Sequence, residues 1–112
     1  MEVENAMIIV HDDIILEICF TNSVLGIHNA GVMLEELKKV SESNTKDIVL
    51  NMTSVTSIDS TAIATFVKFV QHLSGSKRVL TMSNVAPDIM KIFGMLKMSA
   101  FFKLKEKKAD PS

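Results

Sequence analysis

The sequence predicts a single α/β domain, with a mixed four- to five-stranded sheet that is entered by an antiparallel hairpin and has helices packed against it. Three observations predict this fold. Two strand patterns stand side by side near the N-terminus, three amphipathic helix patterns follow, and further strand patterns alternate with those helices. Strands that alternate with helices are typical of a parallel sheet, whereas two strands joined by a tight turn pair antiparallel. The expected element order is ββαβαβα(β).

The hairpin is predicted over residues 7–20. Residues 7–10 form an apolar run, and the polar residues 11–13 separate it from a second strand over residues 14–20. In this second strand apolar side chains alternate with Glu17 and Cys19, which is typical of a strand with one face toward the core. The side chains expected to face the core are Ile14, Leu16, Ile18 and Phe20.

Three helices are predicted from apolar residues at helical spacing. The first follows a loop over residues 21–29 and covers residues 30–40, and the second begins near Ser60 and extends to Leu73. The third begins at Pro87, where a proline suits the first helical turn, and ends at about Gly94. The side chains of the second helix expected to face the core are Ile63, Phe66, Val67, Val70 and Leu73.

Three further strands complete the sheet. Residues 48–52 show little alternation, which is typical of a central strand covered on both faces. Residues 78–82 form another strand, and residues 101–104 form a short edge strand. The domain is therefore expected to span residues 1–104, followed by a disordered tail over residues 105–112.

Length and charge exclude several classes of protein. A chain of 112 residues fits one domain, and a net charge of −1 gives no long-range field for nucleic acid. The basic cluster at residues 103–108 is interrupted by Glu106, so we interpret it as a solvated tail. No apolar run approaches the roughly 20 residues that span a bilayer, and residues 1–5 do not resemble a secretory signal. We expect a cytoplasmic protein with neither a nucleic acid nor a membrane as partner.

The sequence also offers little for metal binding or catalysis. One cysteine, Cys19, cannot form an internal disulfide or by itself build a zinc site, and the three histidines lie far apart along the chain. Ser60 lies in no G-x-S-x-G motif, and there is no glycine-rich phosphate loop. We therefore expect no metal, no cofactor and no enzymatic activity, and we rank a small-ligand or hydrolase role last.

Residues 50–64, LNMTSVTSIDSTAIA, carry the functional information. A strand ends, a polar turn follows, and Asp59-Ser60-Thr61 stands directly before a helical pattern. All three residue types cap helices well, since their side-chain oxygens accept hydrogen bonds from the free N–H groups of the first turn. On physical grounds alone the segment predicts a well-capped helix and nothing more.

The same segment resembles the signature of the STAS domain, which is found in anti-sigma factor antagonists and in the C-terminal parts of sulfate transporters. The resemblance covers residues 7–104 in element order as well as at the Asp59-Ser60-Thr61 motif. It implies a STAS fold in which Ser60 is phosphorylated by an anti-sigma factor that is also a serine kinase. At residues 62–64 this chain has Ala-Ile-Ala where the family usually has Gly-Leu-Gly. Alanine is the next smallest residue, so we expect a surface of similar shape.

The resemblance implies an anti-sigma factor antagonist that binds the kinase when unphosphorylated and releases it when Ser60 is phosphorylated. The residues expected to contact the partner are Asp59, Ser60, Thr61, Ala62 and Ala64. Two alternatives remain open, a non-switching STAS scaffold and an accessory subunit of a signalling complex or membrane transporter. Apolar residues around Met90, Met95 and Met98 are expected mainly in the core, and they leave a homodimer open.

Overall fold

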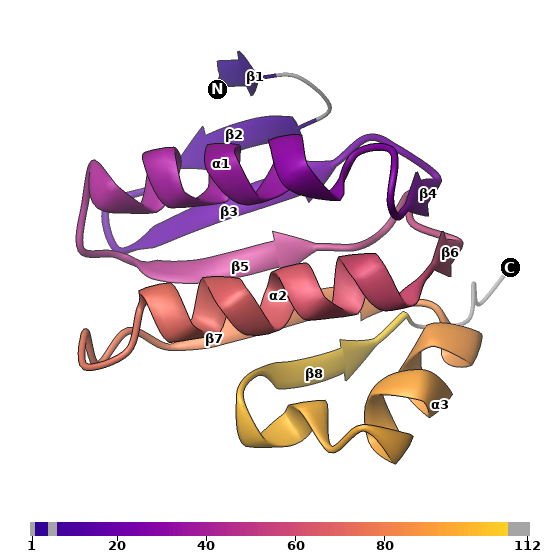
Figure 1. Ribbon diagram of the computed structural model, residues 1–112. Coiled ribbons are helices and arrows are strands. Elements are labelled where there is room, and N and C mark those ends of the chain that lie inside the picture. Colours follow the sequence, from indigo (N-terminus) through magenta and orange to yellow (C-terminus); the bar gives the residue numbers. More distant parts are fainter. Residues whose placement is uncertain (1, 5–6, 108–112) are drawn as a thin grey trace, which may run out of the picture.

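The computed structural model describes residues 2–4 and 7–107. Within them a six-stranded sheet has the order β1-β2-β3-β5-β7-β8, and β4 and β6 form a separate two-stranded sheet. The strands are β1 (Glu2–Glu4), β2 (Met7–His11), β3 (Ile15–Phe20), β4 (Val24–Leu25), β5 (Asp47–Asn51), β6 (Ser57–Ile58), β7 (Leu80–Val85) and β8 (Lys103–Glu106). The helices are α1 (Ala30–Glu42), α2 (Ser60–His72), α3 (Pro87–Met95) and the short 3₁₀ turn η1 (Met98–Ala100). Figure 1 shows α1 and α2 side by side across the sheet, with α3 beside β8.

The predicted α/β class and the entering hairpin are confirmed. β2 pairs with β3 antiparallel, and β3, β5, β7 and β8 then pair in parallel. One strand was not expected, since β1 pairs antiparallel with the outer edge of β2. In the described part of the chain, no helix is long and apolar enough to cross a membrane.

The helices cover one face of this sheet. Leu16, Ile18 and Leu50 point to that face and are fully buried, whereas Val49 and Cys19 point the other way and are half-buried. The prediction that the central strand is covered on both faces is therefore wrong. That prediction was based on the lack of alternation in residues 48–52, but only alternate residues of β5 lie under a helix.

Side-chain packing differs from the prediction in two further places. Ile14 is 71% exposed, because it lies in the turn before β3 and not within the strand. In α2 the fully buried side chains include Phe69, which we did not expect, while Ile63 and Val67 are only half-buried at the border of the core. The buried stripe of α2 thus lies about one residue away from the predicted one.

The last strand extends past the predicted end of the domain. Residues 98–100 form η1, so β8 begins at Lys103 rather than at residue 101, and Glu106 still pairs with Val85 of β7. Lys105 and Glu106, which we placed in a disordered tail, therefore belong to the sheet. The Lys107 amide also donates to the Val85 carbonyl at 2.8 Å, and the remaining residues of the predicted tail, 108–112, lie outside the described residues.

Phe66 of α2 holds the layers together. Its ring makes edge-to-face contacts with Phe20 of β3, Phe93 of α3 and Phe102 before β8, at centroid distances of 6.2, 6.5 and 6.4 Å. Such contacts add to the free energy of burial. One side chain thus fixes α2, which carries the Asp-Ser-Thr motif at its start, against both halves of the sheet.

We expect Phe66→Ala to lower the free energy of unfolding by about 3–5 kcal/mol, because it leaves a cavity among three aromatic rings. Phe101→Ala is the matched control, since Phe101 is 46% exposed, and it should cost less than about 1 kcal/mol. Urea unfolding followed by circular dichroism measures both changes. Equal losses in the two variants would contradict the central role of Phe66.

Candidate functional site

The site lies where the parallel strands β3 and β5 reach their C-terminal ends. β3 leads into β4 and α1, and β5 leads into β6 and α2, so both connections emerge at the same end of the sheet (Figure 1). β4 and β6 pair in parallel, with Val24 opposite Ser57 and Leu25 opposite Ile58. The two connections are therefore paired with each other and form one surface.

Asp59 joins these connections through its carboxylate. Oδ1 accepts a hydrogen bond from the Ala62 amide at 3.0 Å and so caps α2, while Oδ2 accepts one from the Ile27 amide, also at 3.0 Å. Both oxygens of one side chain are thus used by backbone groups that are far apart in sequence. The Ala62 amide chiefly, and then the Ile27 amide, hold the pKa of Asp59 below its usual value, and the nearby His28 contributes in the same direction.

Gly26 lies against this carboxylate. A Cβ atom at position 26 would lie 2.4 Å from Oδ2 of Asp59 and 2.9 Å from its Cγ, so any side chain there would have to displace the carboxylate. Asn29 fixes the same turn, since its Oδ1 accepts from the Gly26 amide and its Nδ2 donates to the Val24 carbonyl, each at 2.8 Å. The loop over residues 24–29 is therefore shaped to receive Asp59.

The five residues expected to contact a partner do not all reach the surface. Asp59, Ser60 and Ala64 are exposed, and Thr61 is half-buried. Ala62 is 0% exposed, so its methyl group lies in the core, and the expectation that it contacts a partner needs correction. The reason is its position on α2, one turn before Phe66, on the side that faces the sheet.

Sequence reasoning missed the half of the site that comes from residues 24–29. All of these residues except Leu25 line, together with Asp59, an open hollow of about 220 Å³. The side chains of Val24 and Ile27 beside it are 54% and 70% exposed. The only local signal was a glycine three residues before an asparagine at the start of a helix. Nothing in the sequence indicated that this turn meets Asp59, which lies more than 30 residues further on.

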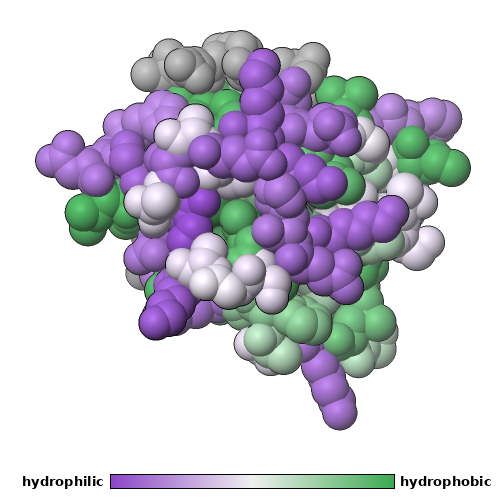
Figure 2. All heavy atoms as spheres, turned by 60° about the vertical axis from the view of Figure 1, so that its left-hand side comes forward, coloured by the Kyte–Doolittle hydropathy of each residue, from purple (hydrophilic) through white to green (hydrophobic). Residues whose placement is uncertain are grey.

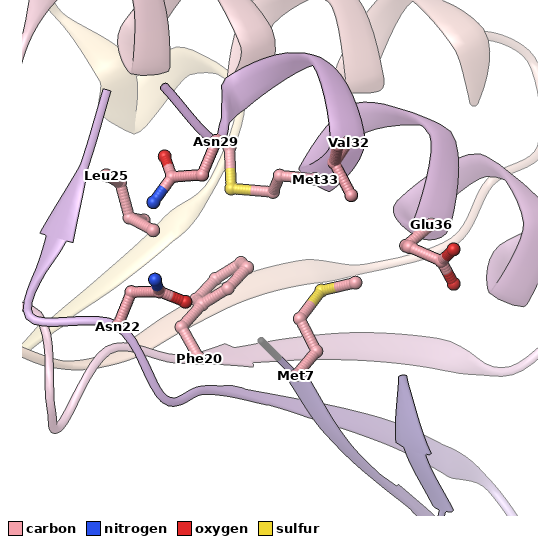
Figure 3. Close-up of a pocket in the computed structure, with 8 residues that line it drawn as sticks. All are labelled: Met7, Phe20, Asn22, Leu25, Asn29, Val32, Met33 and Glu36. Atoms are coloured by element: carbon pink, nitrogen blue, oxygen red, sulfur yellow. The ribbon is translucent and has the colours of Figure 1, made fainter. Parts of the chain in front are cut away.

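A second pocket lies between the first turns of α1 and the strands β2 and β3 (Figure 3). It is narrow, with a volume of about 40 Å³, and Asn29 borders both spaces. Phe20, Leu25 and Met33 make its lining apolar, while the Oδ1 atom of Asn22 is buried there with no hydrogen-bond partner among the described residues. A space this small holds a few waters at about 10–15 Å³ each, so we interpret it as a packing gap and not as a substrate site.

The described residues contain no cluster of three or more side chains suited to a metal ion. Cys19 is half-buried on the sheet face away from the helices, and burial chiefly, with the Glu17 carboxylate second, raises the pKa of its thiol. A thiol with a raised pKa stays protonated at neutral pH and is a poor nucleophile or metal ligand.

Comparison with known proteins shows the family. The family model described as the STAS domain matches residues 5–110, so this chain belongs to the STAS domain family. A search of curated proteins gives no match.

Three solved structures have the same fold. An anti-sigma-factor antagonist (STAS) domain protein of Planctomyces limnophilus gives a TM-score of 0.80 at 11% identity, over 91% of each chain. A Thermotoga maritima protein assigned as an anti-sigma factor antagonist gives 0.75 at 16% identity, over 89% of this chain and 86% of that one. The unphosphorylated form of the anti-sigma factor antagonist SpoIIAA gives 0.67 at 13% identity, over 93% and 90%. At such identities the likeness establishes the fold alone.

Gly26→Ala tests the contact between Gly26 and Asp59. The new methyl group must displace the carboxylate and leave the Ile27 amide without its partner, so we expect a loss of about 1–3 kcal/mol in the free energy of unfolding. Gly31→Ala in α1 is the matched control, since a Cβ there meets nothing within 4 Å. That change should stabilise the helix by about 0.5–1 kcal/mol, and urea unfolding distinguishes the opposite signs. A neutral Gly26→Ala would show that the loop does not depend on this fit.

Asp59→Asn tests the charge of the carboxylate. A lowered folded-state pKa gives stability that is fully present above the unfolded-state value, about 3.9, and is lost as the pH falls through the folded-state pKa. We therefore expect the wild type to be more stable than Asp59→Asn at about pH 7, and the difference to shrink below about pH 4. Urea unfolding at a series of pH values measures it, and a difference that does not change with pH would contradict a role for the charge.

Proposed function

We propose that this protein is an anti-sigma factor antagonist that works by partner switching. Unphosphorylated, it binds an anti-sigma factor that is also a serine kinase; phosphorylated on Ser60, it releases that partner. The proposal rests on one observation above all, the exposed Ser60 side chain at the start of α2, directly beside a carboxylate that is fixed in place. The role needs no catalysis by this chain, and it implies the cytoplasm, where kinase, ATP and sigma factor meet.

The surroundings of Ser60 suit a protein partner. Val24 and Ile27 are large apolar side chains with most of their surface in solvent, and they lie on the same end of the molecule as Ser60. Exposed apolar groups rimmed by polar ones are typical of protein–protein contacts. Because β4 and β6 tie the two connections together, this surface is formed before the partner arrives, which lowers the entropic cost of binding.

Phosphorylation would change the charge of this surface without changing the fold. A phosphate adds about −1.5 to −2 charge. The Thr61 and Ala62 amides, which could otherwise attract it, already interact with the Asp59 carboxylate. The phosphate would therefore stay in solvent next to a second negative charge that cannot turn away. A partner surface matched to a neutral serine would have to desolvate both charges, and binding would weaken.

We expect phosphate on Ser60 when the protein is isolated from its own cells and mapped by peptide mass spectrometry, in a fraction that changes with growth conditions. Ser57→Ala is the matched control, since Ser57 is also exposed, three residues earlier in β6. It should keep the modification, whereas Ser60→Ala should lose it. Binding of a purified anti-sigma factor kinase should weaken at least about thirtyfold on phosphorylation, with an unchanged circular dichroism spectrum.

Two outcomes would overturn the proposal. If Ser60 is unmodified under every condition, the switch is absent, and a non-switching STAS scaffold or accessory subunit becomes the better hypothesis. If phosphate is found on Ser57 or Thr61 instead, the switch exists, but the position taken from the family motif is wrong.

A further inference from the structure

A second exposed apolar surface lies at the corner between α3 and β8. Met95, Leu96 and Phe101 are 77%, 48% and 46% exposed, although all three are large apolar side chains. The Lys97 amide donates to the Gly94 carbonyl and the Phe101 amide to the Met98 carbonyl, so the three residues belong to one short turn region between α3 and β8. We call these three residues the α3–β8 corner.

The corner lies away from the Ser60 surface. α3 starts just after the C-terminal end of β7, on the same side as the start of α2, and runs back toward the start of β8 (Figure 1). Figure 2 brings the opposite end of the molecule forward. Hydrophilic side chains dominate that view, but hydrophobic ones gather at its lower edge, at the height of α3 and η1 in Figure 1.

Positive charge surrounds this corner. Residues 89–105 contain four lysines and no acidic residue, and all four lysines are exposed: Lys91, Lys97, Lys103 and Lys105. Lys91 lies one helical turn before Met95 on the same face of α3, Lys97 follows Leu96 directly, and Lys103 is two residues after Phe101. The nearest acidic residues along the chain are Asp88, two turns back at the start of α3, and Glu106, near the far end of β8. Along the chain the three exposed apolar residues are therefore flanked by lysines and not by acidic side chains.

The combination of exposed apolar side chains and lysines indicates which kind of partner could bind here. Two copies meeting through the corner would bring like-charged lysines together, which opposes self-association. None of the three corner residues lines either of the two pockets described above. A few apolar side chains at a tip, ringed by lysines, fit a surface that is anionic outside and apolar just beneath.

We propose that the α3–β8 corner is a peripheral docking site for an anionic lipid surface. Met95, Leu96 and Phe101 enter the boundary between headgroups and acyl chains, and the surrounding lysines face the negative headgroups. This differs from the expectation of no membrane partner, which rested on the lack of a spanning run. Peripheral contact needs only an apolar tip and positive charge. The corner includes no residue of the Ser60 surface, so docking there leaves Ser60 free for a protein partner.

Vesicle flotation with the full chain tests the proposal. We expect the protein to float with vesicles that contain about one-third phosphatidylglycerol, and not with vesicles of phosphatidylcholine alone, with binding that weakens as salt is added. Met95→Ser with Leu96→Ser and Phe101→Ser should weaken binding more than about tenfold. Lys103→Gln with Lys105→Gln should weaken it about thirtyfold at low salt.

The matched control is Ile14→Ser with Val32→Ser, which removes apolar side chains of similar exposure, 71% and 52%, from other parts of the surface. It should leave flotation unchanged, and circular dichroism should show every variant folded. No flotation of the wild type with anionic vesicles would overturn the proposal, as would equal loss in the control. A concentration-dependent dimer in analytical ultracentrifugation that the triple serine variant abolishes would also overturn it, in favour of a second copy as occupant. None of these results depends on Ser60, so the proposed switch stands or falls separately.

Discussion

The functional end of this molecule depends on the two hydrogen bonds that the Asp59 carboxylate accepts. One comes from the first turn of α2 and the other from the loop before α1, so a single side chain sets the start of one helix relative to the approach of the other. Gly26 makes room for it, and β4 pairs with β6 on the same side. Connections that follow parallel strands are often mobile and independent. Here they form one surface, because each is fixed to the other by backbone groups and one carboxylate.

The opposite end of the sheet is held by a cation. The guanidinium of Arg78, just before β7, donates to the backbone carbonyls of Ser41 and Lys46 and to the side chain of Asn44, and so closes the connection between α1 and β5. Burial lowers the pKa of Arg78, but arginine keeps its charge in proteins, so the clamp persists across the ordinary pH range. Between these two ends the core needs only one face of the sheet, where Phe66 meets rings from three other segments. The other face keeps polar pairs, such as Asn51 with Glu17, and is left half-buried.

Which features of this structure the sequence predicts depends on how far apart along the chain the interacting residues are. Local patterns predicted the hairpin and all three helices, because alternation and helical spacing are properties of a few neighbouring residues. They predicted the wrong burial for two residues. Ile14 fits the apolar pattern but lies in an exposed turn, and Phe69 lies on the face of α2 that packs against the sheet. At the site, the motif predicted Asp59 as a cap, but it could not show that Ala62 is buried. Nor could it show that Gly26 and Asn29 complete the site. They lie about 30 residues before Asp59, and the spacing of neighbouring residues does not reveal contacts between such distant positions.

The way Asp59 is held also decides what a modification at Ser60 can do. In many helices the free amides of the first turn can bind a phosphate and draw the modified segment into a new shape. Here the Asp59 carboxylate already accepts a hydrogen bond from the first turn of α2. The same carboxylate is fixed by a second hydrogen bond, from the Ile27 amide outside the helix. Rearrangement would have to break both contacts and would bring two anions together. A new charge at Ser60 is thus left on a surface that does not move, and only a partner that must cover the surface can respond to it.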